Sequence, residues 1–158
     1  MKNIFLITYI IVLSASLPGC AATNPYNVVD DNYSLLHNWM KEKDEGLISL
    51  FFNHSDDNFL NWGLFKARKD VVFKVPSGHR VVIVNVIYAP NGVWRMGGPF
   101  NLHETFVRIN FNAEKGKSYQ PNATIQNGIA EVWVEEVGGK IVSDVVSAKI
   151  IPYVEKYK

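Results

Sequence analysis

From Leu47 onward, hydrophobic residues in this 158-residue chain recur at every second position in short runs, and no longer at the spacing of a helix. Alternation of this kind places successive side chains on opposite faces of a strand. The runs are rich in β-branched and aromatic residues, and they read LISLFF, DVVFKV, RVVIVNVIYA, TFVRINF, ATIQ, AEVWVEE and KIVSDVVSAKII. The pattern predicts an all-β domain, a small antiparallel β-sandwich of about seven strands.

Turn-forming residues separate these runs. They are Pro76-Ser77-Gly78, Glu114-Lys115-Gly116, Gln126-Asn127-Gly128 and Val137-Gly138-Gly139. Asn127-Gly128 is the strongest signal, because a two-residue type I′ turn needs positive φ at both central positions. We expect the turn at residues 76–78 to close a hairpin that leads into residues 80–89. That run is almost uniformly apolar, which is typical of a central strand.

The run EVWVEE indicates which face of its strand is buried. Val132 and Val134 point one way, whereas Glu131, Trp133 and Glu135 point the other way. One face of this sheet should therefore be buried and the other mostly wet. Trp133 is then either a covered residue of the outer face or an exposed aromatic.

Before the strands, the segment YSLLHNWMKEKDEG places apolar residues at helical spacing. These residues are Leu35, Leu36, Trp39 and Met40. Asp31 or Asn32 could cap such a helix and Gly46 could stop it. The sequence therefore predicts one short N-terminal helix. Trp39 and Trp62 are expected in the core.

The chain begins with a short positive segment, Met1-Lys2-Asn3, and an apolar run from Ile4 that is too short for a comfortable membrane span. The run ends in Leu17-Pro18-Gly19-Cys20, which resembles the lipobox of bacterial lipoprotein precursors. The resemblance implies that the Cys20 thiol carries a diacylglycerol, that cleavage occurs before Cys20, and that the freed amine is acylated. Pro18 departs from the pattern, because that position more often carries Ala, Ser or Thr.

This resemblance implies a division of the chain. Residues 1–19 would be a lipoprotein signal peptide, residues 20–32 a polar tether, and residues 33–158 the β-sandwich domain. Two or three acyl chains hold a protein durably on a membrane, whereas one does so only marginally. Because Ala21 and not Asp follows the cysteine, the expected location is the outer membrane, facing the periplasm. Cys20 is the single cysteine, which excludes an internal disulfide and a cysteine-based metal site.

A second resemblance covers about half of the chain, from Val71 to about Val142. A Pro-x-Gly turn followed by His79 opens a long strand, and a later strand ends in Ala-Glu-x-Gly-Lys-x-Tyr at residues 113–119. Together these motifs resemble small bacterial lipoprotein and periplasmic β-sandwich domains of unknown function. The resemblance implies a fold and a compartment, and it implies no reaction.

Charge and motifs favour no nucleic acid and no catalysis. The chain has 16 basic and 15 acidic side chains without a basic cluster, so nucleic acid is not expected as a partner.

The segment HSDD at residues 54–57 lacks a second histidine at ligand spacing and is interpreted as a polar turn. His103 and Glu104 are adjacent, so in a strand they would point to opposite faces. Ser77, near His79, lies in a predicted turn without a nucleophile elbow. We therefore expect no catalytic, cofactor or metal site.

The segment YAPNGVWRMGGPFNLHE, residues 88–104, is the most informative one for binding. It is longer than a simple hairpin connection and carries aromatic residues and an arginine, which protein interfaces favour. The candidate partner-binding residues are Trp94, Arg95, Met96 and Phe100. Alternatively, Trp94 and Phe100 fold back and cover an open end of the sandwich.

The predicted function is that of a lipid-anchored, non-enzymatic module of the cell envelope that binds a protein partner or supports an envelope assembly. The alternative is a binding module for a small or polymeric envelope ligand such as peptidoglycan. An enzyme is the third class.

Overall fold

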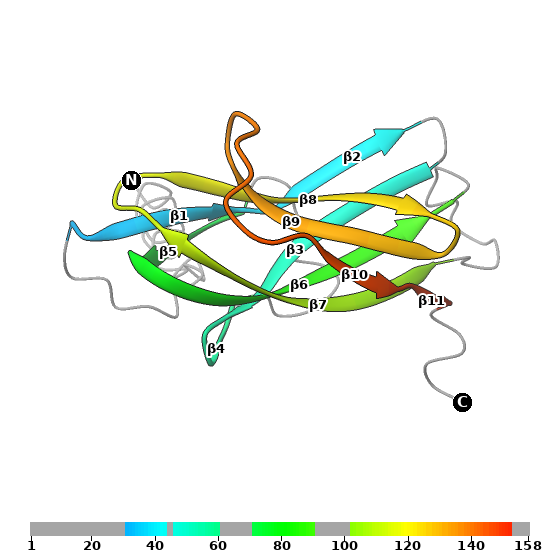
Figure 1. The fold of residues 1–158 in the computed structure, drawn as a ribbon, viewed down its shortest axis with the longest axis horizontal. Helices are drawn as coiled ribbons and strands as arrows, with labels where there is room; N and C mark the ends of the chain where they lie inside the picture. The colour runs from blue at the N-terminus through cyan, green and yellow to red at the C-terminus, as the bar shows by residue number, and fades with distance from the viewer. Residues whose placement is uncertain (1–30, 44–45, 61–70, 91–101, 153–158) are drawn as a thin grey trace, which may run out of the picture.

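The computed structural model describes residues 31–43, 46–60, 71–90 and 102–152. Within them the regular elements are strands, which form two sheets (Figure 1). In spatial order, sheet A contains β10 (Val146–Lys149), β9 (Ile129–Glu136), β8 (Ser118–Gln126), β1 (Tyr33–His37) and β5 (Val72–Pro76). Sheet B contains β11 (Ile151–Pro152), β7 (His103–Ala113), β6 (Gly78–Ala89), β3 (Gly46–Ser55) and β2 (Trp39–Lys43), and β4 (Asn58–Phe59) pairs with β3.

The predicted all-β class is confirmed, and the strand pairs are antiparallel apart from the parallel pair of β1 and β8. The described residues contain eleven strands, so the expected number of about seven was too small. Three of the additional strands are β1, β2 and β4, and the last predicted run is divided between β10 and β11.

One hydrophobic core lies between the two sheets. The longer strands contribute every second side chain to it, because successive side chains of a strand point to opposite faces. The largest fully buried core side chains include Leu36, Val75, Tyr119, Val132 and Val134 from sheet A, and Leu50, Phe52, Val82, Val84, Val86 and Ile109 from sheet B. Trp39, as expected, packs against this core.

Two local predictions are confirmed. β6 is a central strand of sheet B, with β7 on one side and β3 on the other. β8 and β9 form a hairpin in which Gln126 pairs with Ile129, so only Asn127 and Gly128 lie between the strands. Their φ angles are 52° and 75°, the positive values that a type I′ turn requires.

The helix predicted between Asn32 and Gly46 is wrong, because this segment forms β1 and β2. Short apolar runs fit a helix and a strand about equally well, and here pairing with distant strands decides the structure. Leu36 faces the core, whereas Leu35 faces outward. Gly46 begins β3 at a φ of 134°, where a Cβ atom would collide with the carbonyl oxygen of Ala89. In the described part of the chain, no helix has the length and apolar character needed to cross a membrane.

The hairpin expected at Pro76-Ser77-Gly78 is also wrong. β5 pairs with β1 in sheet A, whereas β6 pairs with β3 and β7 in sheet B, so this turn is a corner between the sheets. Gly78 adopts a φ of 108°, which favours glycine, and the Ser77 N–H donates to the carbonyl oxygen of Asn32. A turn motif fixes a local change of direction, but it does not specify which strands pair.

The chain passes directly from sheet A to sheet B between β1 and β2, and Asn38 lies at the crossing. The backbone N–H of this buried residue donates to the carbonyl oxygen of Val71. Its side-chain Oδ1 accepts a hydrogen bond from the Phe52 N–H at 3.1 Å. The pairing of β2 with β3 ends at Trp39 and Leu50, so no β2 residue lies opposite Phe52. The Asn38 side chain takes the place of a strand partner for the Phe52 N–H.

A second crossing, at Ile150, lies between β10 in sheet A and β11 in sheet B. Ile150 is buried, and its N–H donates to the carbonyl oxygen of Gly128. Just before these strands, Ile141 forms a bridge with Glu135 of β9 and Ser143 forms one with Phe111 of β7. The C-terminal segment thus contacts both sheets alternately along one side of the sandwich (Figure 1).

Candidate functional site

Six outward-pointing side chains of β8 and β9 form the surface that we call the Trp133 face. They lie opposite one another in three pairs, Gln120 with Glu135, Asn122 with Trp133, and Thr124 with Glu131. Their neighbours along the strands, such as Val132 and Val134, fill the core on the other side of the sheet. The Trp133 face therefore belongs to the outer surface of sheet A.

Glu135 is the centre of a hydrogen-bond network on this face. Its Oε1 accepts from Gln120 Nε2 at 2.8 Å and from Asn122 Nδ2 at 3.1 Å. Its Oε2 accepts from Trp133 Nε1 at 3.0 Å and from the same Asn122 Nδ2 at 3.1 Å. The expectation of a mostly wet outer face is wrong at this position, because Glu135 is only 6 % exposed.

The network decides the charge of Glu135. Burial pushes the pKa of this carboxyl upward, but hydrogen bonds from Gln120, Trp133 and Asn122 together outweigh burial and hold the pKa below its ordinary value. Glu135 is therefore a carboxylate at neutral pH. A carboxylate with each oxygen already bound is suited to orienting its neighbours, and poorly suited to releasing a proton near pH 7.

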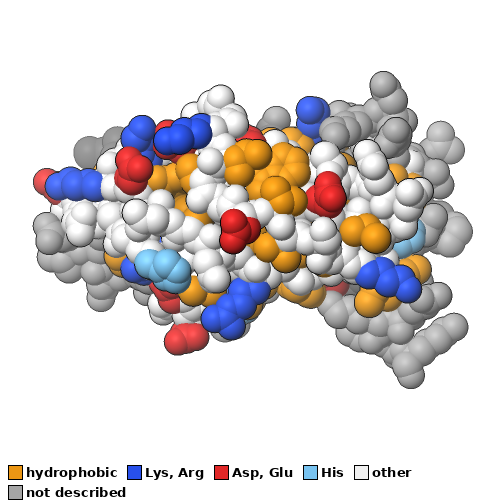
Figure 2. All heavy atoms as spheres, viewed as in Figure 1, with side chains coloured by type: hydrophobic (Ala, Val, Ile, Leu, Met, Phe, Trp, Pro, Cys, Tyr) orange, Lys and Arg blue, Asp and Glu red, His pale blue; other side chains and the backbone are white. Residues whose placement is uncertain are grey.

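Trp133 is half-buried, with its indole N–H directed along the strand to Glu135. This position lies between the two predicted alternatives of a covered residue and an exposed one. Figure 2 shows hydrophobic side chains gathered where β8 and β9 lie in Figure 1, with acidic side chains on either side of them. The exposed Ile141, which bridges to Glu135, borders the face.

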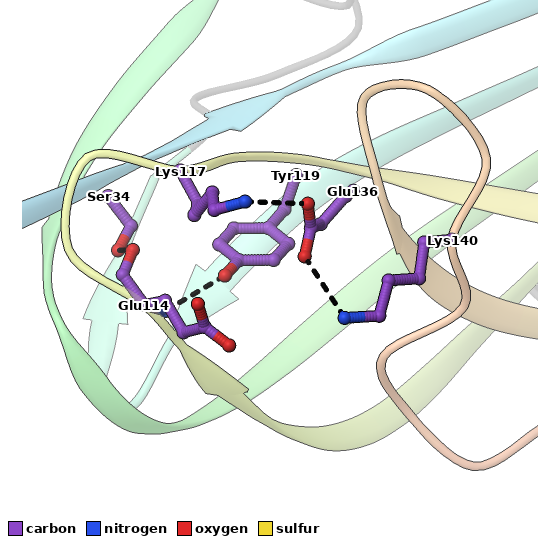
Figure 3. Close-up of polar contacts among 6 residues, drawn as sticks. All are labelled: Ser34, Glu114, Lys117, Tyr119, Glu136 and Lys140. Carbon is purple, nitrogen blue, oxygen red and sulfur yellow. Dashed lines mark hydrogen bonds and ion pairs between the residues drawn. The ribbon is translucent and has the colours of Figure 1, made fainter.

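The motif Ala-Glu-x-Gly-Lys-x-Tyr forms a corner from β7 to β8 at one end of the sandwich (Figure 3). The buried Tyr119 places its hydroxyl oxygen where it accepts from the Glu114 N–H at 2.8 Å. Gly116, at a φ of 74°, donates from its N–H to the carbonyl oxygen of Tyr33, and the Leu35 N–H donates to Lys117. The motif thus docks β1 onto the corner, which is a structural role.

The same corner carries an ion-pair cluster on Glu136 (Figure 3). Its carboxylate lies 3.2 Å from Lys117 Nζ and 3.7 Å from Lys140 Nζ. The hydrogen bond to Glu136 raises the pKa of Lys117, and burial raises the pKa of Tyr119. Both lysines are exposed, so these pairs contribute little to stability.

The candidate metal segment HSDD forms a tight turn between β3 and β4. Asp56 adopts a φ of 51°, accepts from Arg80 Nη1 at 2.6 Å and accepts from the Val81 N–H at 3.1 Å. The His54 ring packs edge-on against Phe59. Across residues 31–43, 46–60, 71–90 and 102–152, no group of three or more His, Cys, Asp or Glu side chains is arranged to hold a metal ion.

The other side chains that could take part in catalysis or metal binding lie apart from one another. Ser77 Oγ is 3.4 Å from Ser34 Oγ, in the corner between β5 and β6. His103 packs near Tyr88, whereas Glu104 points to the outer face of sheet B and accepts from Asn85. Burial lowers the pKa of His37, which ends β1.

Trp94, Arg95, Met96 and Phe100 lie outside the residues that the structure describes, and so do Cys20 and Trp62. The network around Glu135 was not predicted. A signal for it was present, because the two-residue turn at Asn127-Gly128 fixes the register that places Gln120 opposite Glu135. No protein-family profile, curated protein or solved structure matches this chain.

Proposed function

We propose that this protein is a lipid-anchored, non-enzymatic binding module of the cell envelope that holds a protein partner. The observation that carries the anchor is the apolar run from Ile4 that ends in Leu17-Pro18-Gly19-Cys20. Acylated Cys20 would attach the domain to the outer membrane on its periplasmic side, and residues 21–32 would separate the membrane from β1.

Binding is favoured over catalysis by how the central carboxylate of the Trp133 face is engaged. Glu135 is held as a charged carboxylate by three side chains. A general acid or base needs a pKa near the working pH and free access to the proton that it transfers. Glu135 instead orients its neighbours, as groups in a recognition surface do.

Two regions support a protein partner. The first is the loop with Trp94 and Arg95, residue types that dominate protein interfaces. The second is the C-terminal segment, which contributes most of the exposed large hydrophobic residues of the described chain. These are Ile129, Val137, Ile141, Val145 and Ile151. Ile129 lies at the start of β9, whereas Val137 and Ile141 lie near its end. Exposed apolar side chains that are neighbours, such as Val137 and Ile141, are typical of surfaces that bind other proteins.

Cys20→Ser tests the anchor. We expect the wild-type chain to partition with membranes and to be processed before residue 20, whereas the variant stays unprocessed and lacks the lipid. A variant that is processed at the same bond and still carries lipid would contradict the anchor.

The double variant Trp94→Ala and Arg95→Ala tests the partner surface, with Val72→Ala as a matched control at an exposed apolar position in β5. The readout is crosslinking to envelope proteins in intact cells. We expect a crosslinked species that the control keeps and the double variant loses while its circular dichroism is unchanged. Equal crosslinking by both variants would exclude this loop as the partner surface.

A further inference from the structure

The Trp133 face holds an aromatic ring whose orientation is set before any ligand arrives. The indole N–H of Trp133 donates to the charged Glu135 carboxylate, a bond stronger than one between neutral groups. Glu135 is itself held by Gln120 and Asn122, and it is more than nine-tenths buried. A ring fixed in this way loses little conformational freedom on binding, which favours affinity.

Neutral hydrogen-bonding groups flank this ring along β8. Gln120 donates one amide N–H to Glu135, so its carbonyl oxygen and second N–H have no hydrogen bond within the described residues. Thr124 donates its hydroxyl hydrogen to Glu131 and keeps acceptor capacity on its oxygen. The surface thus presents donors and acceptors on both sides of an apolar ring.

The charge of the Trp133 face restricts the ligand. Its charged side chains are Glu131 and Glu135, both negative, and its other four members are neutral. A phosphate-bearing ligand, such as nucleic acid or a phospholipid headgroup, would meet like charge and find no arginine or lysine among these six residues. A neutral ligand rich in hydroxyl groups fits better, because its hydroxyls pair with amides and carboxylates while its C–H groups pack against the indole.

We propose that the Trp133 face binds a polysaccharide, with one sugar ring packed against Trp133 and its hydroxyl groups bound by Gln120, Thr124 and Glu131. The residues come from two extended, adjacent strands, so a linear polymer can lie along them. The proposal rests on the proposed function only for the compartment, since an envelope anchor would bring the glycan strands of peptidoglycan within reach. It does not depend on the Trp94 loop.

The test uses the full chain, purified in detergent, and two probes. The first probe is isolated peptidoglycan sacculi, with which bound protein sediments. The second is chitohexaose, a soluble β-1,4-linked N-acetylglucosamine hexamer that carries no peptide, measured by titration calorimetry. The variants are Trp133→Ala, Trp133→Tyr and Gln120→Ala. Phe106→Ala is the matched control, because Phe106 is an exposed aromatic on the other sheet.

We expect the wild-type chain to bind both probes, Trp133→Ala to bind them about tenfold or more weakly, and Phe106→Ala to bind as the wild type does. Trp133→Tyr should keep most of the affinity, and Gln120→Ala should weaken it. If Trp133→Ala does not fold by circular dichroism, Gln120→Ala decides, and unchanged affinity in that folded variant overturns the proposal.

Three other results would overturn the proposal. The wild-type chain could bind neither of the two probes. Trp133→Ala could bind both probes as tightly as the wild type does. Sedimentation with sacculi but no heat with chitohexaose would show recognition of the peptide stems and not of the glycan. The anchor is tested separately by Cys20→Ser, so failure of the glycan assay leaves the membrane attachment to be decided by its own experiment.

Discussion

The two outer faces of the sandwich each bury a carboxylate, but they surround it with different side chains. On sheet A, Glu135 accepts from two amides and an indole. On sheet B, Glu104 is 9 % exposed and accepts from Asn85 Nδ2 at 2.9 Å, while Ile87 lies opposite Glu104. Phe51, opposite Asn85, is only 2 % exposed although it points away from the core. The buried carboxylate of sheet A is thus surrounded by polar partners, whereas that of sheet B lies beside apolar side chains.

The difference shows that burial of an outward residue has two physical origins in this molecule. The oxygens of Glu135 are satisfied by its neighbours, so its burial keeps a charged group in a fixed place. On sheet B, Asn85 Oδ1 is buried without a hydrogen-bond partner, and an unpaired buried polar atom costs about 1–3 kcal/mol. Burial of apolar surface around Phe51 and Ile87 offsets such a cost. A polar face lacks this source of stabilisation.

Phe51→Ala should have the largest effect on stability. If the outer face of sheet B is packed like a core, the variant should lose about 3–5 kcal/mol of unfolding free energy, because a buried aromatic side chain leaves a cavity. Urea denaturation measures this loss. The control is Phe106→Ala, which removes an exposed ring of the same face. Equal and small losses in both variants would show that this face is not packed.

Glu135→Ala should have the next largest effect. It leaves three side-chain donors without their acceptor, so we expect a loss of about 2–3 kcal/mol in urea denaturation. Glu131→Ala is the matched control, since Glu131 is exposed on the same strand and the same face. Its loss should stay within about 0.5 kcal/mol. Indistinguishable losses in the two variants would mean that the network contributes nothing to folding.

The pH dependence of stability should follow the same network. The folded pKa of Glu135 lies below its ordinary value of 4.5, so the unfolded chain binds the proton more readily. Its stabilising contribution is therefore complete above pH 4.5 and is lost as the pH falls through the lower, folded pKa. Urea midpoints measured from neutral to acidic pH should fall less steeply in Glu135→Gln than in the wild type. Identical slopes would contradict the shift.

Asn85→Ala should have the smallest effect. The variant loses the hydrogen bond to Glu104, but it also removes a buried oxygen without a partner, and these two changes offset each other. We expect a loss of about 1 kcal/mol or less. If urea denaturation gave a loss as large as that of Glu135→Ala, the two carboxylates would have the same role and the contrast between the faces would fail.

Features that depend on neighbouring residues could be predicted from the sequence. The alternation of Val132 and Val134 with Glu131 and Trp133 identified the two faces of β9, because strand periodicity is a local property. Asn127-Gly128 identified the hairpin, because few residue pairs adopt two positive φ angles at low cost.

Features that depend on distant pairing could not be predicted. β1 pairs with β5 and with β8, which begins more than 80 residues later in the chain, and only these partners make Tyr33–His37 a strand. The corner at Pro76-Ser77-Gly78 has the local chemistry of a hairpin, and the sheets beyond it decide otherwise. Relative placement of strands is a tertiary property that local propensity does not determine.

The candidate site lies between these two cases. The residue types of the Trp133 face were visible in the sequence, but an outward glutamate on a strand is ordinarily solvated. Only the register across β8 and β9 shows that Glu135 faces two amides, one of them from Asn122 beside Trp133. The partner residues proposed from the loop, Trp94 and Arg95, stay a prediction.

The position of β1 has a mechanical consequence for a tethered domain. β1 lies inside sheet A, between β5 and β8, and the chain enters it at its N-terminal end. A pull on residue 31 that is directed along the strand therefore loads the hydrogen bonds to both neighbours together, in shear, instead of opening them one at a time. Asn38, where the same segment crosses into sheet B, passes the remaining force to the second sheet. If residues 20–32 are the tether that we propose, the sandwich can bear load applied through them.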